Sequence, residues 1–393
     1  MGDSASLPHL PDTERRADMG RPDPDPLDDL IVSIATQGLD DGQSLRSLGV
    51  SLGCDLRVAV VGTGAFGRNH LRVYREMAGV TLVAAIEPDD GRAAEVAEQY
   101  EIPVFANVGD ALAADLKLDA ASVAVPTVHH RAVAGELLAG GVDCLVEKPL
   151  SANLVEADEL IALSEKHGRI LQVGHLERFN PAVLAIEPKL TRPMFFEAHR
   201  LSVFTPRSLD VDVVLDLMIH DLDIVLTFAA SPVKEVRAVG LPILSPKVDI
   251  ANVRVEFESG CVANFTASRV STERVRKLRF FEPRQYVSID YARRDVLVIG
   301  VDPEFSIEKA MALGAAAGFQ DGLPGLSFSK PEVTPGEPLR LEIASFLDSV
   351  RTRRAPRVTA RQGREALALA LEIQKQMVEH AGKAGLGDFF AAS

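Results

Sequence analysis

LRVAVVGTGAFG, residues 56 to 67, is the stretch of sequence that decides the fold of this chain. Its first half is an apolar run typical of a buried strand, and Asn69 to Met77 beyond its glycines has the pattern of a helix. In a strand-turn-helix unit such glycines permit a tight turn, let the backbone approach a pyrophosphate, and allow the helix to pack closely on the strand. The alternative is a glycine turn that binds no ligand. We predict a dinucleotide site at Gly62, Gly64, Ala65, Phe66 and Gly67.

An acidic residue follows the next predicted strand, Val80 to Ile86. Glu87 lies about 20 residues past Gly67, the spacing at which a carboxylate accepts hydrogen bonds from the adenosine ribose diol. A negative charge there would repel the 2′-phosphate of NADP, and no arginine is adjacent to it before Arg92. We therefore predict NAD as the cofactor; the alternative is that Glu87 is a surface residue in a turn.

Two patterns of secondary structure divide the rest of the chain. Strands and helices alternate up to about residue 177, which predicts a parallel, doubly wound sheet, whereas residues 178–326 contain mostly short strands. The sequence thus predicts an α/β protein with an N-terminal Rossmann domain at 54–177. A C-terminal α+β domain with an open, mainly antiparallel sheet is expected at 178–326. Residues 310–329 are expected to form a loop or flap, and helices within 327–393 are expected to pack back on the first domain.

Composition and charge exclude several classes of protein. The 393 residues include 47% hydrophobic and 25% charged residues, as in a folded globular protein. The net charge of −14 argues against nucleic acid and anionic membranes as partners, and no apolar run reaches the ~18 residues of a membrane span. Residues 1–53 form an acidic, Pro- and Asp-rich extension, which we expect to be partly disordered. Three widely spaced cysteines indicate no disulfide framework, so the expected location is the cytoplasm.

Two motifs follow predicted strands of the first domain. Pro126 and His130 come after one strand, and Glu147-Lys148-Pro149 comes after the next. The carboxyl ends of parallel strands form the edge where open α/β folds bind ligands. A lysine at this edge can donate a hydrogen bond to a substrate oxygen, although most lysines at strand ends are solvated.

A predicted helix in the second domain presents a carboxylate beside an imidazole. Apolar residues from Leu215 to Leu226 recur at helical spacing, and Asp216 and His220 are four residues apart on the neighbouring stripe. We predict that Asp216 orients His220 and helps to set its pKa near neutrality, as a general base requires. The alternative is a structural Asp-His pair. A metal site is not expected, because no further His or Cys lies at ligand spacing.

In their order along the chain, these four motifs resemble the glucose-fructose oxidoreductase / inositol dehydrogenase (Gfo/Idh/MocA) family, from about Leu56 to about Met377. The resemblance implies NAD(P)-dependent oxidation of a secondary hydroxyl of a sugar or polyol. It implies catalytic roles for Lys148, Asp216 and His220, and cofactor contacts from Pro126, His130, Glu147 and Lys148. Two residues depart from the family pattern: Glu87 stands where Asp is frequent, and Met218 stands where Gly is usual.

Three further segments, Gly174–Pro181, His199–Leu201 and Val213–Asp221, resemble the branch that oxidises UDP-N-acetylglucosamine for lipid A. This resemblance implies a UDP-N-acetylhexosamine substrate oxidised at its 3-hydroxyl to the 3-keto sugar. The free face of the second sheet is expected to pair subunits into a homodimer or homotetramer. Alternatives are an inositol or free-sugar dehydrogenase of the same family, and a non-catalytic NAD-binding sensor. Substrate contacts are expected from Arg178, Asn180 and Arg200.

Overall fold

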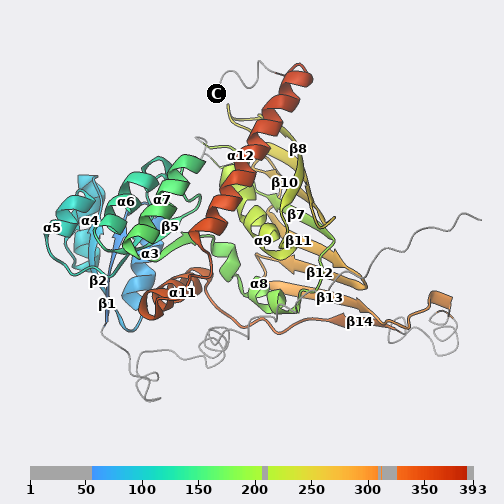
Figure 1. Cartoon of the computed structure of the whole chain (residues 1–393), viewed down its shortest axis with the longest axis horizontal. Helices are drawn as coiled ribbons and strands as arrows, with labels where there is room; N and C mark the ends of the chain where they lie inside the picture. Colours follow the sequence, from blue (N-terminus) through green and yellow to red (C-terminus); the bar gives the residue numbers. More distant parts are fainter. Residues whose placement is uncertain (1–54, 206–210, 309–310, 312–324, 387–393) are drawn as a thin grey trace, which may run out of the picture. The chain divides into compact units, whose positions relative to one another are not determined.

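The computed structural model describes residues 55–205, 211–308, 311 and 325–386. Within these ranges two β-sheets dominate, and each has its own hydrophobic core (Figure 1). The extension predicted at 1–53 lies outside the described residues, as does most of the loop predicted at 310–329. In the described ranges no helix is both long and apolar enough to cross a lipid bilayer.

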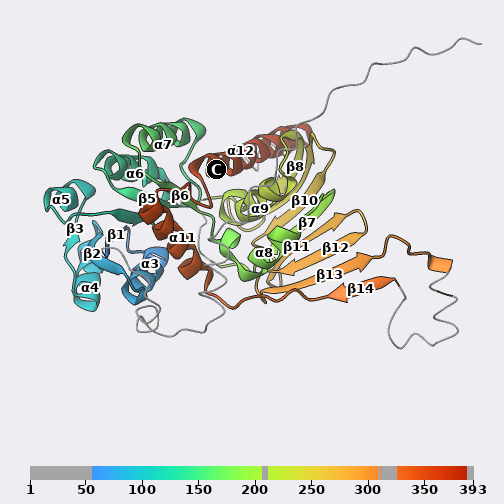
Figure 2. The same ribbon diagram turned by 60° about the horizontal axis from the view of Figure 1, so that its bottom comes forward.

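The first sheet has six parallel strands in the order β3-β2-β1-β4-β5-β6, with helices on both faces (Figure 2). Strands covered on both faces need apolar side chains throughout, which is why they are visible in the sequence as continuous apolar runs. The strand order reverses between β1 and β4, and this switch point creates the crevice where such sheets receive a dinucleotide. The strands are β1 Leu56–Val61, β2 Val80–Ile86, β3 Val104–Phe105, β4 Ala120–Val123, β5 Asp143–Glu147 and β6 Leu171–Gly174. The helices are α3 Ala65–Glu76, α4 Asp90–Tyr100, α5 Val108–Ala113, α6 His130–Ala139 and α7 Leu154–His167.

The second sheet has eight strands in the order β14-β13-β12-β11-β7-β10-β9-β8. Its neighbouring strands are antiparallel except for β7 and β10, which run parallel. Buried and partly exposed residues alternate along β7, as expected when one face of a sheet is covered. Helices α8 (Pro181–Ile186), α9 (Ile219–Ala229) and α12 (Ala360–Lys383) contribute to the core on that face. The predicted fold class is therefore confirmed. The strands are β7 Phe195–Leu201, β8 Val233–Leu241, β9 Ile250–Phe257, β10 Val262–Ser268, β11 Val275–Glu282, β12 Gln285–Asp290, β13 Asp295–Val301 and β14 Leu326–Ser329.

The two C-terminal helices are divided between the two cores. Ile343 and Phe346 of α11 (Pro338–Thr352) lie in the core of the first sheet. Leu369 and Ile373 of α12 lie in the core of the second sheet, where α12 packs on β8 and α9. The sequence predicts that both helices pack on the first domain, and for α12 the structure corrects this: only its start contacts α7 and β6.

Two short elements differ from the sequence prediction. Leu326–Ser329 is strand β14, paired with β13, and not part of a loop. Four residues at the edge of a sheet are too few to show the alternation that marks a longer strand. Helix α5 was not predicted, because its six residues span fewer than two helical turns.

Candidate active site

The turn between β1 and α3 has the backbone geometry that dinucleotide binding requires. Gly62 has φ +82°, and a Cβ there would lie 2.7 Å from the carbonyl oxygen of Ala124. A Cβ on Gly67 would collide with the carbonyl oxygen of Gly62, so only glycine allows this close approach. At Gly64 a Cβ would meet no described atom within 4 Å, and Gly64 is exposed together with Ala65 and Phe66.

The first turn of α3 begins at exposed residues. No side chain among the described residues caps the helix at Gly64. Uncapped amides at a helix N-terminus carry partial positive charge and bind phosphate groups. The residues of the turn therefore fit the pyrophosphate of a dinucleotide, which Gly64, Ala65, Phe66 and Gly67 would hold through their backbone.

Glu87 lies at the end of β2 and is only 4% exposed. One carboxylate oxygen accepts hydrogen bonds from the amide and hydroxyl of Thr63, at 2.9 and 2.8 Å. The other accepts from the amide of Asp89 at 3.1 Å and from the guanidinium of Arg92 at 2.8 Å. Burial alone would raise the pKa of this carboxyl, but the hydrogen bonds from Arg92 and Thr63 hold the pKa of Glu87 at about 2.

The sequence analysis placed no arginine beside Glu87, and the structure corrects this. Arg92 lies in the first turn of α4, and its side chain, 47% exposed, reaches back to the carboxylate. A guanidinium at this position offers a cation to a 2′-phosphate. Arg92 therefore offsets part of the repulsion that the sequence predicts between the Glu87 carboxylate and the 2′-phosphate of NADP.

Lys148 follows β5 and connects the first domain to the helix that carries Asp216. Its Nζ donates a hydrogen bond of 2.8 Å to the main-chain oxygen of Asp216, and lies 4.0 Å from the Asp216 carboxylate. Burial lowers the pKa of Lys148, while the Asp216 carboxylate opposes that shift. The amine is thus held at the sheet edge with an acceptor that a substrate oxygen can replace.

The predicted hydrogen-bonded pair of Asp216 and His220 is wrong. The structure describes both residues and contains no hydrogen bond between them; the carboxylate faces Lys148 instead. The cause is the turn Val214–Met218, which is π-helical and precedes α9. A π turn has i to i+5 hydrogen bonds, so residues four apart no longer share one face as they do in an α-helix.

His220 has the properties of a general base. It is partly exposed, and its Nδ1 has no hydrogen-bond partner among the described residues. Burial and the charges of Lys148 and Arg200 hold the pKa of His220 well below its usual range. The predicted pKa near neutrality is therefore wrong: the imidazole is neutral at pH 7, which is the form that can accept a proton, but its pKa lies below the neutral range.

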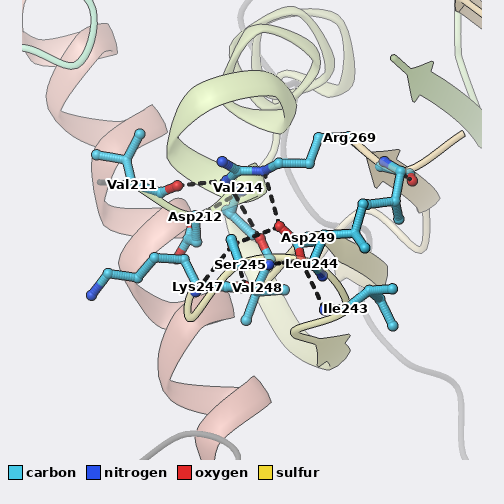
Figure 3. Close-up of polar contacts among 12 residues, drawn as sticks. Val211, Asp212, Val214, Ile243, Leu244, Ser245, Lys247, Val248, Asp249 and Arg269 are labelled. Carbon is cyan, nitrogen blue, oxygen red and sulfur yellow. Dashed lines mark hydrogen bonds and ion pairs between the residues drawn. The ribbon is translucent and has the colours of Figure 1, made fainter. Parts of the chain in front are cut away.

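We call the π turn together with α9 the candidate catalytic helix. Residues that the sequence analysis missed hold the start of this helix through hydrogen bonds (Figure 3). Asp212 accepts hydrogen bonds from the amides of Val214 and Leu215, at 2.9 and 3.0 Å. Arg269 donates to the main-chain oxygen of Val211, and its own amide donates to the main-chain oxygen of Asp249. An aspartate just before a helical pattern is a capping signal that could have identified Asp212, whereas nothing local distinguishes Arg269.

The carboxylate of Asp249 organises the loop beside that helix start. It accepts hydrogen bonds from the amides of Ile243, Leu244 and Ser245, at 2.8, 2.6 and 2.9 Å. The main-chain oxygen of Val248, the residue before Asp249, accepts a hydrogen bond of 3.0 Å from the amide of Val213. One buried carboxylate thus fixes a loop that contacts the candidate catalytic helix (Figure 3).

The three residues expected to contact substrate are buried and have partners inside the protein. Arg200 forms hydrogen bonds to both carboxylate oxygens of Asp221, at 2.7 and 3.0 Å, and a third to Glu177 at 3.0 Å. Asn180 donates to Glu177 and to the main-chain oxygen of Tyr291. Arg178 donates to Thr227 at 2.6 Å. Since they are 2 to 4% exposed, the structure gives Arg178, Asn180 and Arg200 positions behind the candidate catalytic helix.

The remaining predicted residues differ in exposure. Pro126 is exposed at the sheet edge. His130 is 1% exposed, and its ring nitrogens lie 2.9 Å from the carbonyl oxygens of Val125 and Pro149. His130 therefore connects the backbones that follow β4 and β5 through both of its ring nitrogens. Glu147 is 8% exposed and is bonded to His70 at 3.0 Å.

Comparison with known proteins places these features in one family. The NAD-binding Rossmann fold of the GFO/IDH/MocA oxidoreductases matches residues 56–175, and the family's C-terminal domain matches residues 187–284. UDP-N-acetylglucosamine 3-dehydrogenase of Acidithiobacillus ferrooxidans is 34% identical over 320 residues, covering 81% of this chain and 96% of that protein. A solved structure of that species' UDP-N-acetylglucosamine 3-dehydrogenase GnnA has a TM-score of 0.73 at 33% identity, over 82% of this chain and 97% of that chain.

An inositol 2-dehydrogenase of Leifsonia xyli is 33% identical, over 46% of this chain and 56% of that protein. The two family models together cover the first sheet and strands β7 to β11 of the second, and the Acidithiobacillus enzyme is matched over almost its whole length. The chain therefore belongs to the Gfo/Idh/MocA family of oxidoreductases, and the cofactor of its Rossmann domain is NAD.

Proposed function

We propose that this dehydrogenase oxidises the 3-hydroxyl of a UDP-N-acetylhexosamine to the 3-keto sugar. The observation that carries the proposal is the approach of Lys148 to the π turn at Asp216, which brings a lysine beside the helix of the neutral His220. The substrate class is supported by the 34% identical relative, because the match spans 96% of that enzyme.

Each residue has a defined part in the proposed reaction. His220 accepts the hydroxyl proton on its neutral imidazole. Lys148 exchanges the Asp216 carbonyl for the substrate oxygen and stabilises the negative charge that develops there. Asp216, 4.0 Å from the amine, keeps Lys148 in place. When bound, NAD would supply the acceptor for the hydride that leaves the carbon bearing this hydroxyl. The C–O bond then becomes C=O as the O–H and C–H bonds break.

We assign a supporting role to three buried residues, Arg178, Asn180 and Arg200. Arg200 fixes Asp221, the neighbour of His220, and Arg178 contacts Thr227 one turn and a half further along α9. A substrate phosphate would have to break these buried contacts to reach either guanidinium. We propose that the three residues shape the pocket by positioning the candidate catalytic helix.

A second candidate is oxidation of an inositol or a free sugar. It is supported by the inositol 2-dehydrogenase at 33% identity, although that match covers only 56% of the relative. Formation of NADH, measured by absorbance with UDP-N-acetylglucosamine, myo-inositol and free N-acetylglucosamine, separates the two candidates. We expect turnover with the UDP-sugar to exceed the others at least tenfold, with Lys148→Ala as the background control. Faster turnover of myo-inositol than of the UDP-sugar would contradict the proposal and favour an inositol dehydrogenase.

These absorbance measurements, together with a measurement of NAD binding, also test whether the chain is a non-catalytic NAD-binding sensor. NAD binding measured by calorimetry, without NADH formation from any of the three compounds, would favour a non-catalytic NAD-binding protein.

We further propose a homodimer or homotetramer, acting in the cytoplasm. On the face of the second sheet opposite its buried alternate residues, Phe281 contacts Phe195 and Tyr286, with ring centroids 5.5 and 5.1 Å apart. These partly exposed aromatic rings would gain from burial against a second copy. Sedimentation of wild type and Phe281→Ser tests this, and a monomeric wild type would contradict it.

A further inference from the structure

Four buried side chains form a continuous chain of hydrogen bonds behind Lys148. Tyr74 Oη lies 2.7 Å from Ser122 Oγ, which lies 3.0 Å from His70 Nδ1. His70 Nε2 lies 3.0 Å from an oxygen of Glu147, the residue before Lys148. His70, Tyr74 and Ser122 have no solvent exposure. The chain connects α3, which begins at the glycine turn, to the end of β5 by way of β4.

The direction of each hydrogen bond follows from the chemistry of the groups. An ionised Glu147 carboxylate can only accept, so His70 Nε2 must carry the proton that it donates. In a neutral ring Nδ1 then accepts, and the Ser122 hydroxyl is its donor. Ser122 in turn accepts from the hydroxyl of Tyr74, which keeps its proton because burial raises the pKa of Tyr74.

The absence of a side chain at Gly174 leaves room for the carboxylate of Glu147. A Cβ on Gly174, in the neighbouring strand β6, would lie 3.1 Å from Cα, Cδ and Oε1 of Glu147. The carboxyl group thus packs against Gly174 on one side and bonds to His70 on the other. Fixing this side chain fixes the backbone from which Lys148 extends to Asp216.

We propose that His70 is a positioning residue for Lys148, acting through Glu147 and held in one tautomer by Ser122 and Tyr74. The proposal rests on the proposed function, because Lys148 requires precise placement only if it contacts the reacting oxygen. His70 lies on the helix whose first turn would hold the cofactor pyrophosphate. One rigid element therefore places both the cofactor and the catalytic amine.

Two polar substitutions of similar size test this placement. The amide of His70→Gln can reach Glu147, whereas the shorter amide of His70→Asn can reach only Ser122. We expect His70→Asn to lower kcat about ten- to a hundredfold, the cost of a misplaced catalytic group, and His70→Gln to stay within about fivefold of wild type. The dissociation constant of NAD, measured by calorimetry, should change less than threefold in both. Equal kcat values for the two folded variants would overturn the proposal.

A matched control comes from the same strand. Cys144 is buried in β5 on the opposite face from Glu147, and we expect Cys144→Ala to keep kcat within about twofold. A fall in kcat for Cys144→Ala as large as that for His70→Asn would mean that any loss of packing in β5 disturbs the site, and it too would overturn the proposal.

NMR can determine which ring nitrogen of His70 carries the proton without any measurement of turnover. In protein labelled with ¹⁵N-histidine, the His70 ring signals are those missing from His70→Gln. Without NAD or substrate, they should show a ring that carries its proton on Nε2 and not on Nδ1. A ring protonated at Nδ1 would overturn the proposal even if His70→Asn failed to fold. Absence of sugar oxidation by wild type would instead overturn the proposed function, and the ring signals of His70 would then report only whether the hydrogen-bond chain to Glu147 is present.

Discussion

Two pairs of oppositely charged side chains lie beside the candidate catalytic helix, and they differ in how firmly they are held. The side chains of Lys148 and Asp216 are 17% and 27% exposed, and their charged atoms are 4.0 Å apart. Those of Arg200 and Asp221 are both 3% exposed and share hydrogen bonds of 2.7 and 3.0 Å. A loose, partly exposed pair can exchange a partner for a substrate, whereas separating a tight buried pair leaves charges without solvation. The first pair therefore suits chemistry, and the second suits support.

The largest effect is expected from substituting Lys148 of the first pair or the nearby His220. Lys148→Ala and His220→Ala should each lower kcat by about two to four orders of magnitude, because each removes a proton-handling or charge-stabilising group from the same oxygen. Their effects should not add in the double variant. Thermal midpoints should stay close to wild type. If His220→Ala kept more than a third of wild-type turnover, with a deuterium isotope effect showing that chemistry is rate-limiting, His220 would not be the base.

Breaking the second pair should cost stability. Arg200→Ala leaves Asp221 and Glu177 buried without their cation, and loss of one partner of a buried pair typically costs about 3–5 kcal/mol. Urea unfolding measures this loss. As a control, Arg92→Ala removes an arginine that is half exposed, and it should change urea unfolding much less than Arg200→Ala does. Unchanged unfolding of Arg200→Ala together with a raised KM for the sugar would instead make Arg200 a direct substrate contact.

The two pairs also show what could be predicted from the sequence. The glycine turn was correctly placed between a strand and a helix, and Glu87 at the end of the next strand, because these elements follow one another between residues 56 and 87 and are set by local chemistry. The contact of Asp216 with His220 was predicted from α-helical spacing and fails, since one π turn changes which residues share a face. Burial of Arg200 depends on strands distant in sequence, so no local pattern distinguishes it from an exposed ligand of substrate.

A smaller effect is expected at the cofactor end. Glu87→Ser removes the carboxylate that repels a 2′-phosphate, so it should narrow the preference for NAD over NADP by about one to two orders of magnitude. Arg92→Ala should weaken NADP about tenfold and NAD less than threefold, if its guanidinium serves the phosphate. Calorimetry with both cofactors measures each change. Equal or tighter binding of NADP by wild type would contradict the role given to Glu87.

The smallest expected effect is the change of kcat/KM between pH 8 and pH 6.5. His220 must be neutral to act as the base, and its pKa is held well below 6.5 by burial and by the charges of Lys148, Arg200, His175 and Arg276. Activity is therefore present above that lowered pKa and is lost as pH falls through it, so kcat/KM should change less than about twofold over this interval. Lys148 determines the alkaline limb of the pH profile, because it must stay charged to stabilise the substrate oxygen. Burial lowers the pKa of Lys148, so activity should fall at a pH lower than the usual lysine range as pH rises. Arg200→Met, which removes one of the four charges, should move the acidic limb toward higher pH. An acidic limb at or above pH 6.5 in wild type would show that His220 does not feel these charges, and the base would have to be another group.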